Sequence, residues 1–198
     1  MRKVKTSERE EVYSLSVMFY GTYGGSTCIL APLSIPIGPI PISLTNLVVY
    51  FTVYVIGLKA GTCSYCLYVL LGVVGLPVFS GYVGGPAKIA GPTGGYIVGF
   101  VLMALIGGYV IEKTNRNMVL VIIAWIVGTM ADYALGTAWF AYVQHCTVGY
   151  ALKVCVYPFI VFDLIKIVAA TFLGKAVRYA LVKAGLLSND KVVSGVTA

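Results

Sequence analysis

A carboxylate and an amine lie three residues apart in an apolar stretch near the end of the chain, PFIVFDLIKIVAATF. These residues are Asp163 and Lys166, and residues at this spacing share one face of a helix. Charges within an apolar helix are costly and usually functional, so we expect both to point inward. Two interpretations stay open. The charges neutralise each other as a buried structural pair, or they form a polar clamp in which the carboxylate accepts N–H donors and the ammonium donates to a carbonyl or carboxylate.

Other polar residues are candidates for the same site. Asp132 lies in a second apolar stretch, GTMADYALG, where it either pairs locally or contacts a ligand. Thr45 and Asn46 stand near one end of a third stretch and could line a pocket. His145 is the single histidine, in a polar link where solvation is expected rather than catalysis. Since aromatic residues make up 13% of the chain, we expect apolar, aromatic walls around a few polar groups, as in most small-molecule sites.

The segment from Gly75 to Phe100 contains eight glycines, three prolines and one charge, Lys88. Irregular backbone at membrane depth survives only where protein buries it or where it lines a wet cavity. Glycine also lets a backbone approach a ligand closely. The segment therefore predicts a lid folded over a cavity. The alternative is a flexible extracellular linker, which would be expected to carry more Ser, Lys and Glu.

Sequence signatures of catalysis are missing from the chain. It contains no G-x-x-x-x-G-K-[ST] phosphate loop, no H-E-x-x-H and no G-x-S-x-G. Cys63 and Cys66 form one C-x-x-C without a second pair or a histidine cluster, so packing is expected there rather than metal or redox chemistry. We therefore expect neither an enzyme nor a metal site.

The elements that must position these residues are membrane helices. The chain has 198 residues, of which 59% are hydrophobic and only 11% charged, and its mean hydropathy is +0.92. Soluble domains carry roughly 25% charged residues. We expect an all-α protein that forms a single membrane domain over residues 1–198 and contacts membrane lipid. The net charge of +7 is interpreted as a topology signal, and nucleic acid is not expected as a partner.

Six transmembrane helices are expected, since each needs about 20 apolar residues. The expected spans are Val12–Leu33, Ser43–Leu58, Gly61–Val78, Tyr96–Ile111, Met118–Tyr142 and Val154–Leu173. Residues 1–11 and 175–198 are expected to be cytoplasmic tails, and residues 79–95 an outer lid loop between the third and fourth helices. The proline-rich link PLSIPIGPIPI is expected to be extended, because proline fixes φ and lacks a donor.

The distribution of basic residues supports this span count. With the N-terminus inside, 11 of the 14 lysines and arginines fall on the inner side, and the exceptions are Lys88, Lys153 and Lys166. Basic residues collect on the cytoplasmic side of membrane proteins. We therefore expect both termini in the cytoplasm and a multi-pass protein of a cell membrane.

Several of these motifs together resemble the BioY family. GLPVFSGYVGG, GPTGGYIVGF, FDLIKIVAA and the early IPIGPIPISLTN carry the resemblance, which extends over nearly the whole chain. It implies the biotin-binding substrate-capture subunit (S component) of an energy-coupling-factor (ECF) transporter in the bacterial inner membrane. It also implies a shared transmembrane coupling subunit and ATPase subunits as partners. The ligand is biotin, no cofactor is implied, and ATP would be hydrolysed only by the partner subunits.

The resemblance also suggests binding residues. The family's paired Asp and Lys fall on Asp163 and Lys166, and its glycine-rich lid falls on Gly81–Gly95. Biotin's ureido ring offers two N–H donors and a carbonyl, which a carboxylate and an ammonium can meet. Which of the two meets the ring and which the acid tail stays open. The full set of expected ligand-binding residues is Asp163, Lys166, Tyr82, Val83, Gly84, Gly85, Gly94, Tyr96, Thr45 and Asn46.

One motif departs from the family pattern. Family members commonly show A-x-x-x-A on the first helix, where the coupling subunit docks, whereas this chain has Gly21 and Gly25 near that place. Small residues at this spacing allow close helix packing, either within the bundle or with another protein. The chain could therefore use a standard energising module, a divergent one, or act alone or as a homo-oligomer. Two alternatives to biotin capture are capture of another vitamin and a structural or assembly role without ligand.

Overall fold

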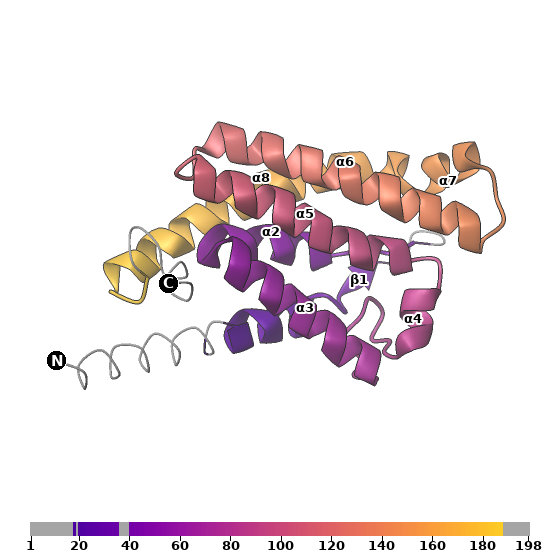
Figure 1. Ribbon diagram of the computed structural model, residues 1–198, viewed down its shortest axis with the longest axis horizontal. Coiled ribbons are helices and arrows are strands. Elements are labelled where there is room, and N and C mark those ends of the chain that lie inside the picture. Colours follow the sequence, from indigo (N-terminus) through magenta and orange to yellow (C-terminus); the bar gives the residue numbers. More distant parts are fainter. Residues whose placement is uncertain (1–17, 19, 36–39, 188–198) are drawn as a thin grey trace, which may run out of the picture.

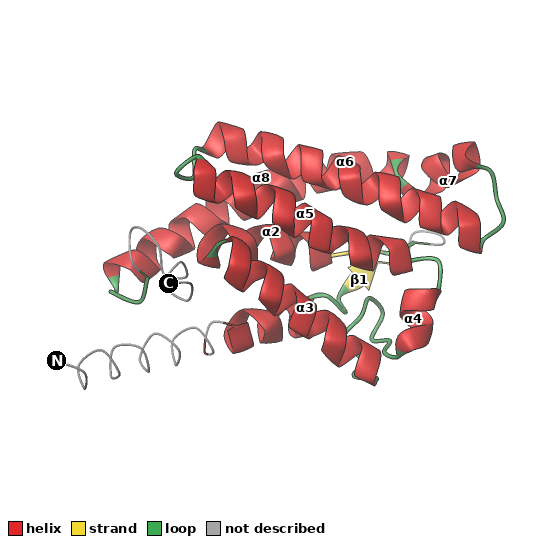
Figure 2. Ribbon diagram, in the orientation of Figure 1, coloured by secondary structure: helices red, strands yellow, loops and turns green. Residues whose placement is uncertain are grey.

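The computed structural model describes residues 18, 20–35 and 40–187, and this part of the chain is mostly helical (Figures 1 and 2). The elements, in chain order, are β1 (Ser34–Ile35), β2 (Ile42–Ser43), α2 (Thr45–Ile56), α3 (Leu58–Val74), α4 (Pro86–Ala90), α5 (Gly94–Lys113), α6 (Met118–Val143), α7 (Val148–Cys155) and α8 (Tyr157–Lys183). Residues 20–30 are also helical. The predicted tail 1–11, the start of the first predicted span, and residues 36–39 and 188–198 lie outside the described residues.

Helix length and composition identify the membrane-spanning elements. α5 and α6 are each long enough to cross a bilayer, with a hydropathy of 2.0. α7 and α8 meet at a bend of 43° and together pass the same test. α2 and α3 are apolar but have only 12 and 17 residues. By length and composition, the described helices provide two membrane spans, or three when α7 and α8 are counted together as one. The sequence predicts six.

Local capping signals explain some of the observed helix ends. α6 begins at the predicted Met118 because the Asn117 side chain accepts hydrogen bonds from the next backbone amides. α3 stops at Val74, four residues before the predicted end, because Gly75 adopts a left-handed conformation with φ of 115°. The proline-rich link is extended where described, since β1 and β2 pair antiparallel through Ser34 and Ser43.

Three helical stretches differ from the sequence expectation. α4 forms inside the predicted lid. α7 begins in the predicted polar link after His145, where the Thr147 side chain caps its first turn, and runs into the start of the predicted sixth span. α8 runs on through residues 175–183, which had been assigned to a tail, since nothing in that stretch breaks a helix.

Glycines bring α5 and α6 into close contact along their length. A Cβ at Gly107 would lie 2.0 Å from the Trp125 ring, and one at Gly136 would lie 2.3 Å from the Tyr96 ring. The two helices lie side by side in Figure 1, with α8 behind them and α2 and α3 beneath. α2 packs against α3, α5 and α8. α4 and α7 lie toward the same end of the bundle (Figure 1).

Candidate functional site

Asp163 and Lys166 form a buried ion pair on α8. Their side chains face the same way, as the spacing predicts, with 3.1 Å between Lys166 Nζ and Asp163 Oδ1. The residues are only 5% and 8% exposed. Lys166 also donates to the backbone carbonyl of Ser43 at 2.9 Å and to Asn46 Oδ1 at 3.1 Å. An ammonium has three N–H donors, so all three are engaged.

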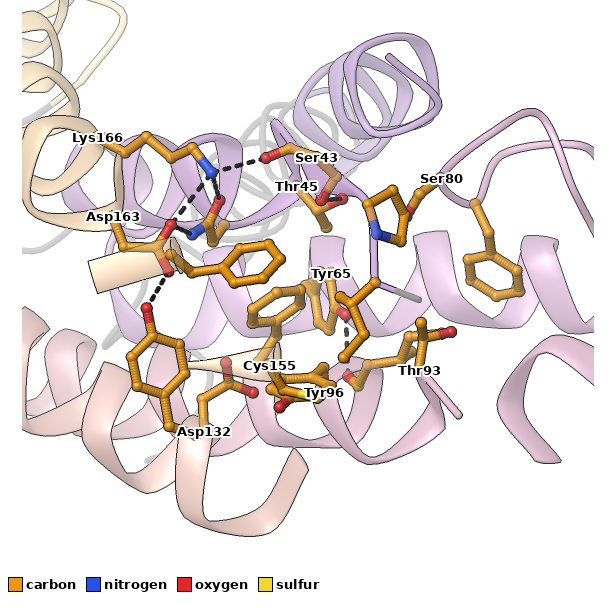
Figure 3. A pocket seen from close by; sticks show the side chains of 18 of the residues that line it. Ser43, Thr45, Tyr65, Ser80, Thr93, Tyr96, Asp132, Cys155, Asp163 and Lys166 are labelled. Atoms are coloured by element: carbon orange, nitrogen blue, oxygen red, sulfur yellow. Dashed lines mark hydrogen bonds and ion pairs between the residues drawn. The ribbon is translucent and has the colours of Figure 1, made fainter. Parts of the chain in front are cut away.

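The Asp163 carboxylate is held from three helices. Asn46 on α2 donates from Nδ2 to Asp163 Oδ1 at 2.7 Å, and Tyr133 on α6 donates from its hydroxyl to Asp163 Oδ2 at 2.5 Å. With the Lys166 bond, three of the roughly four acceptor positions of the carboxylate are used. One position on Oδ2 remains for a further donor. The pair is thus part of a polar network that joins α2, α6 and α8, which Figure 3 shows from close by.

A cavity of about 70 Å³ opens beside this network (Figure 3). One water molecule needs about 10–15 Å³, so the space holds several. Ser43, Thr45, Asn46, Asp163 and Lys166 provide polar atoms on one side. The remaining walls are mainly apolar or aromatic, with the polar residues Ser80, Thr93 and Asp132 among them; they are formed by Ile40, Pro41, Tyr65, Tyr68, Phe79, Ser80, Thr93, Tyr96, Ile97, Phe100, Asp132, Tyr133, Cys155 and Phe159.

The structure brings half of the ten expected site residues to this cavity. Thr45, Asn46, Tyr96, Asp163 and Lys166 line it. The other five, Tyr82, Val83, Gly84, Gly85 and Gly94, lie outside its lining.

The lid reaches the cavity through residues other than the expected ones. Phe79, Ser80 and Thr93 line it, while the Tyr82 side chain is 63% exposed. Phe79 points inward because its ring fits against Gly72, where a Cβ would lie 2.2 Å away. It also pairs with Val83 across a single β-bridge, so the tight turn between them faces outward.

The sequence does not predict several of the cavity residues, although two of them carry a usable signal. Phe159 precedes Asp163 by four residues and Lys166 by seven, which places all three on one helix face. Tyr133 directly follows Asp132 in α6. Tyr65 and Tyr68 on α3 carry no such signal, because the sequence of an apolar helix does not show which of its aromatic residues face a cavity.

Comparison with known sequences decides the family. The BioY family profile matches residues 7–183 of the chain. The chain belongs to the BioY family. A biotin transporter BioY of Thermotoga maritima is 39% identical over 142 residues, which cover 72% of this chain and 83% of the relative. The biotin transporter BioY2 of Lactococcus lactis subsp. cremoris is 31% identical over 174 residues, covering 88% and 94%.

The BioY fold is also seen in a solved structure. The chain is similar to the crystal structure of the S-component for biotin from an ECF-type ABC transporter, with a TM-score of 0.77 at 26% identity. The match covers 83% of this chain and 90% of the other. The BioY resemblance that the sequence motifs indicated is therefore confirmed by both kinds of comparison.

Proposed function

We propose that this chain is a biotin-binding S component that takes up biotin across a cell membrane, in bacteria the inner membrane. Family membership, relatives named as biotin transporters and a solved biotin S-component support this function. The observation that carries it is the buried network of Asp163 and Lys166 beside a cavity with aromatic walls. A polar ring fits the network, and an aliphatic tail fits the walls.

The contacts of the network suggest how a ureido ring is held. A ring N–H can donate to the free acceptor position on Asp163 Oδ2. Lys166 has no spare donor, so it must give up its bond to Ser43 or Asn46 before it can donate to a ligand oxygen. Binding then exchanges one buried hydrogen bond for another, which keeps the desolvation cost small.

The size of the cavity implies that its lining moves on binding. Small-molecule pockets usually measure roughly 300–1,000 Å³, several times the 70 Å³ found here. The lid residues Phe79, Ser80 and Thr93 close part of the wall without a hydrogen bond to the polar network. We therefore assign the movement to the lid, which would open toward the outer side to admit biotin and then shut out water.

The proposed topology has six spans with both termini in the cytoplasm. Besides the charge distribution, one structural feature supports it. Arg116, Lys175, Arg178 and Lys183 line a single cleft with Tyr54. This cleft lies at the end of the bundle away from the lid, where α8 and the α5–α6 link end (Figure 1). Basic residues at one end and the lid at the other fit a cytoplasmic and an outer side.

An ECF coupling subunit and ATPase subunits are the proposed partners, and they alone would hydrolyse ATP. The helical segment 20–30 presents Gly21 and Gly25 on an exposed face, and a Cβ at either would meet nothing within 4 Å. A small-residue face of this kind suits the close approach of a partner helix. The alternative is that the chain acts alone or as a homo-oligomer. Biotin uptake measured with and without candidate ATPase partners distinguishes the two.

Titration calorimetry of the detergent-purified chain tests the proposed ligand. Biotin is expected to bind with a dissociation constant in the nanomolar to low micromolar range, whereas thiamine and riboflavin are expected to give no heat. Competition by either vitamin would point to the same fold with another ligand. Absence of heat with all three, at micromolar protein, would refute vitamin capture and favour a structural role.

A further inference from the structure

Asp132 is a second carboxyl at the cavity, and it lies apart from the polar network. It belongs to α6, is 2% exposed and lines the cavity. In the view of Figure 3 it lies toward Tyr96 and Cys155, below Asp163 and Lys166. Its Oδ1 has no hydrogen-bond partner among the residues that the structure describes. The chain thus places two carboxyl groups at different sides of one small space.

The two carboxyls differ in their hydrogen-bond partners. Asp163 accepts from Asn46, Tyr133 and Lys166. A buried polar atom without a partner costs free energy, and native proteins contain few of them. Such groups are retained where function needs them, and ionisable residues within membrane helices follow this rule closely. Packing alone therefore does not explain why the Asp132 carboxyl is buried.

The contact between α5 and α6 makes room for this carboxyl. A Cβ at Gly99 of α5 would lie 2.2 Å from Asp132 Oδ1, so only glycine fits beside it. The Gly99 amide lies within α5, whose amides bond along the helix. The backbone of α5 thus accommodates the group without giving it a donor. A ligand in the cavity that Asp132 lines can supply a donor to the carboxyl.

We infer that Asp132 is a second ligand-binding carboxyl, which accepts a hydrogen bond from the captured ligand at the side away from Asp163 and Lys166. This inference rests on the proposed function. A cyclic urea carries two N–H groups that flank one carbonyl, so acceptors at two sides of the cavity suit it. A ring with a single N–H leaves one carboxyl without a donor, which costs affinity. Asp132 is thereby a specificity-determining residue for rings with two donors.

The test compares Asp132→Asn and Asp132→Leu with wild type and with Ser64→Ala. Ser64 is a matched control, because its Oγ is also buried without a partner but lies away from the cavity. Titration calorimetry should show at least about tenfold weaker biotin binding for both Asp132 variants and no change for Ser64→Ala. The melting temperature without biotin should stay unchanged for Asp132→Asn and stay unchanged or rise for Asp132→Leu, because only leucine removes the unpartnered polar group. Wild-type affinity in either Asp132 variant overturns the inference, as does a loss that only accompanies lower stability.

A second measurement uses the wild-type chain and so does not depend on the folding of a variant. Biotin labelled with ¹⁵N at both ureido nitrogens is bound, and the exchange of each N–H with water is followed by NMR. Both N–H groups should be protected. One protected and one freely exchanging N–H overturns the role of Asp132 while the proposed function stands. If wild type does not bind biotin at all, the proposed function itself fails.

Discussion

The polar network and the lid bound the same cavity, but different forces hold them. The network joins α2, α6 and α8 through charge-assisted hydrogen bonds around Asp163. The lid, residues 79–95, carries only the five-residue helix α4 and meets the cavity through Phe79, Ser80 and Thr93. From the proposed function we expect the network to provide affinity for a polar ring and the lid to control access to the cavity.

The largest effect is expected on stability, from separating the buried pair. Asp163→Leu leaves Lys166 buried without its counter-charge, which costs about 3–5 kcal/mol. Adding Lys166→Met should restore most of that loss, because an apolar pair of similar volume tolerates burial. Denaturant unfolding of the single and double variants measures both changes. Equal stability of wild type and Asp163→Leu would show that the network does not hold the three helices together.

A milder change at the same carboxyl addresses binding. Asp163→Asn keeps the shape but removes the charge and one acceptor, so biotin affinity should fall at least about tenfold, or roughly 1.4 kcal/mol. Titration calorimetry on protein that retains its helical circular dichroism gives the value. Unchanged affinity in such a folded variant would remove Asp163 from the site.

Tyr133 tests whether the orientation of the carboxylate matters. Tyr133→Phe deletes the hydroxyl that donates to Asp163 Oδ2, and a drop in biotin affinity of about three- to tenfold is expected. Thr171→Val is the control, since it also deletes a buried hydroxyl, one that donates to the Ile167 carbonyl and lies outside the cavity lining. A similar loss in both variants would mean that the effect comes from general packing.

The smallest effect is expected at the tip of the lid. Tyr82 is exposed and has a φ of 59°, which strains a residue with a side chain. Tyr82→Gly should leave biotin affinity within about twofold and raise stability by roughly 1 kcal/mol. A tenfold loss of affinity would show instead that the lid closes Tyr82 onto the ligand, as the sequence analysis expected.

Sequence reasoning succeeded where local signals decide the structure. The i, i+3 spacing placed Asp163 and Lys166 on one inward face, and the predicted fifth span begins at Met118, as α6 does. Thr45 and Asn46 line the cavity because they are the first two residues of α2, which begins beside it.

The features that the sequence did not predict depend on contacts between distant segments of the chain. Tyr133 meets Asp163 only because α6 packs against α8, and no spacing rule encodes that. In the lid, glycine content predicted close backbone approach at residues 84, 85 and 94, but the fit of Phe79 against Gly72 decided which residues face inward. α7 was missed because its Thr147 cap lies in a segment that looks polar and irregular.

The position of bound biotin tests the central claim most directly. A crystal structure of this chain with biotin should show the ureido ring between Asp163, Lys166 and Asp132, with the tail along Phe79 and Phe100. Biotin bound elsewhere, with Asp163 and Lys166 still joined as they are here and no ligand atom within hydrogen-bond distance of either, would contradict the account.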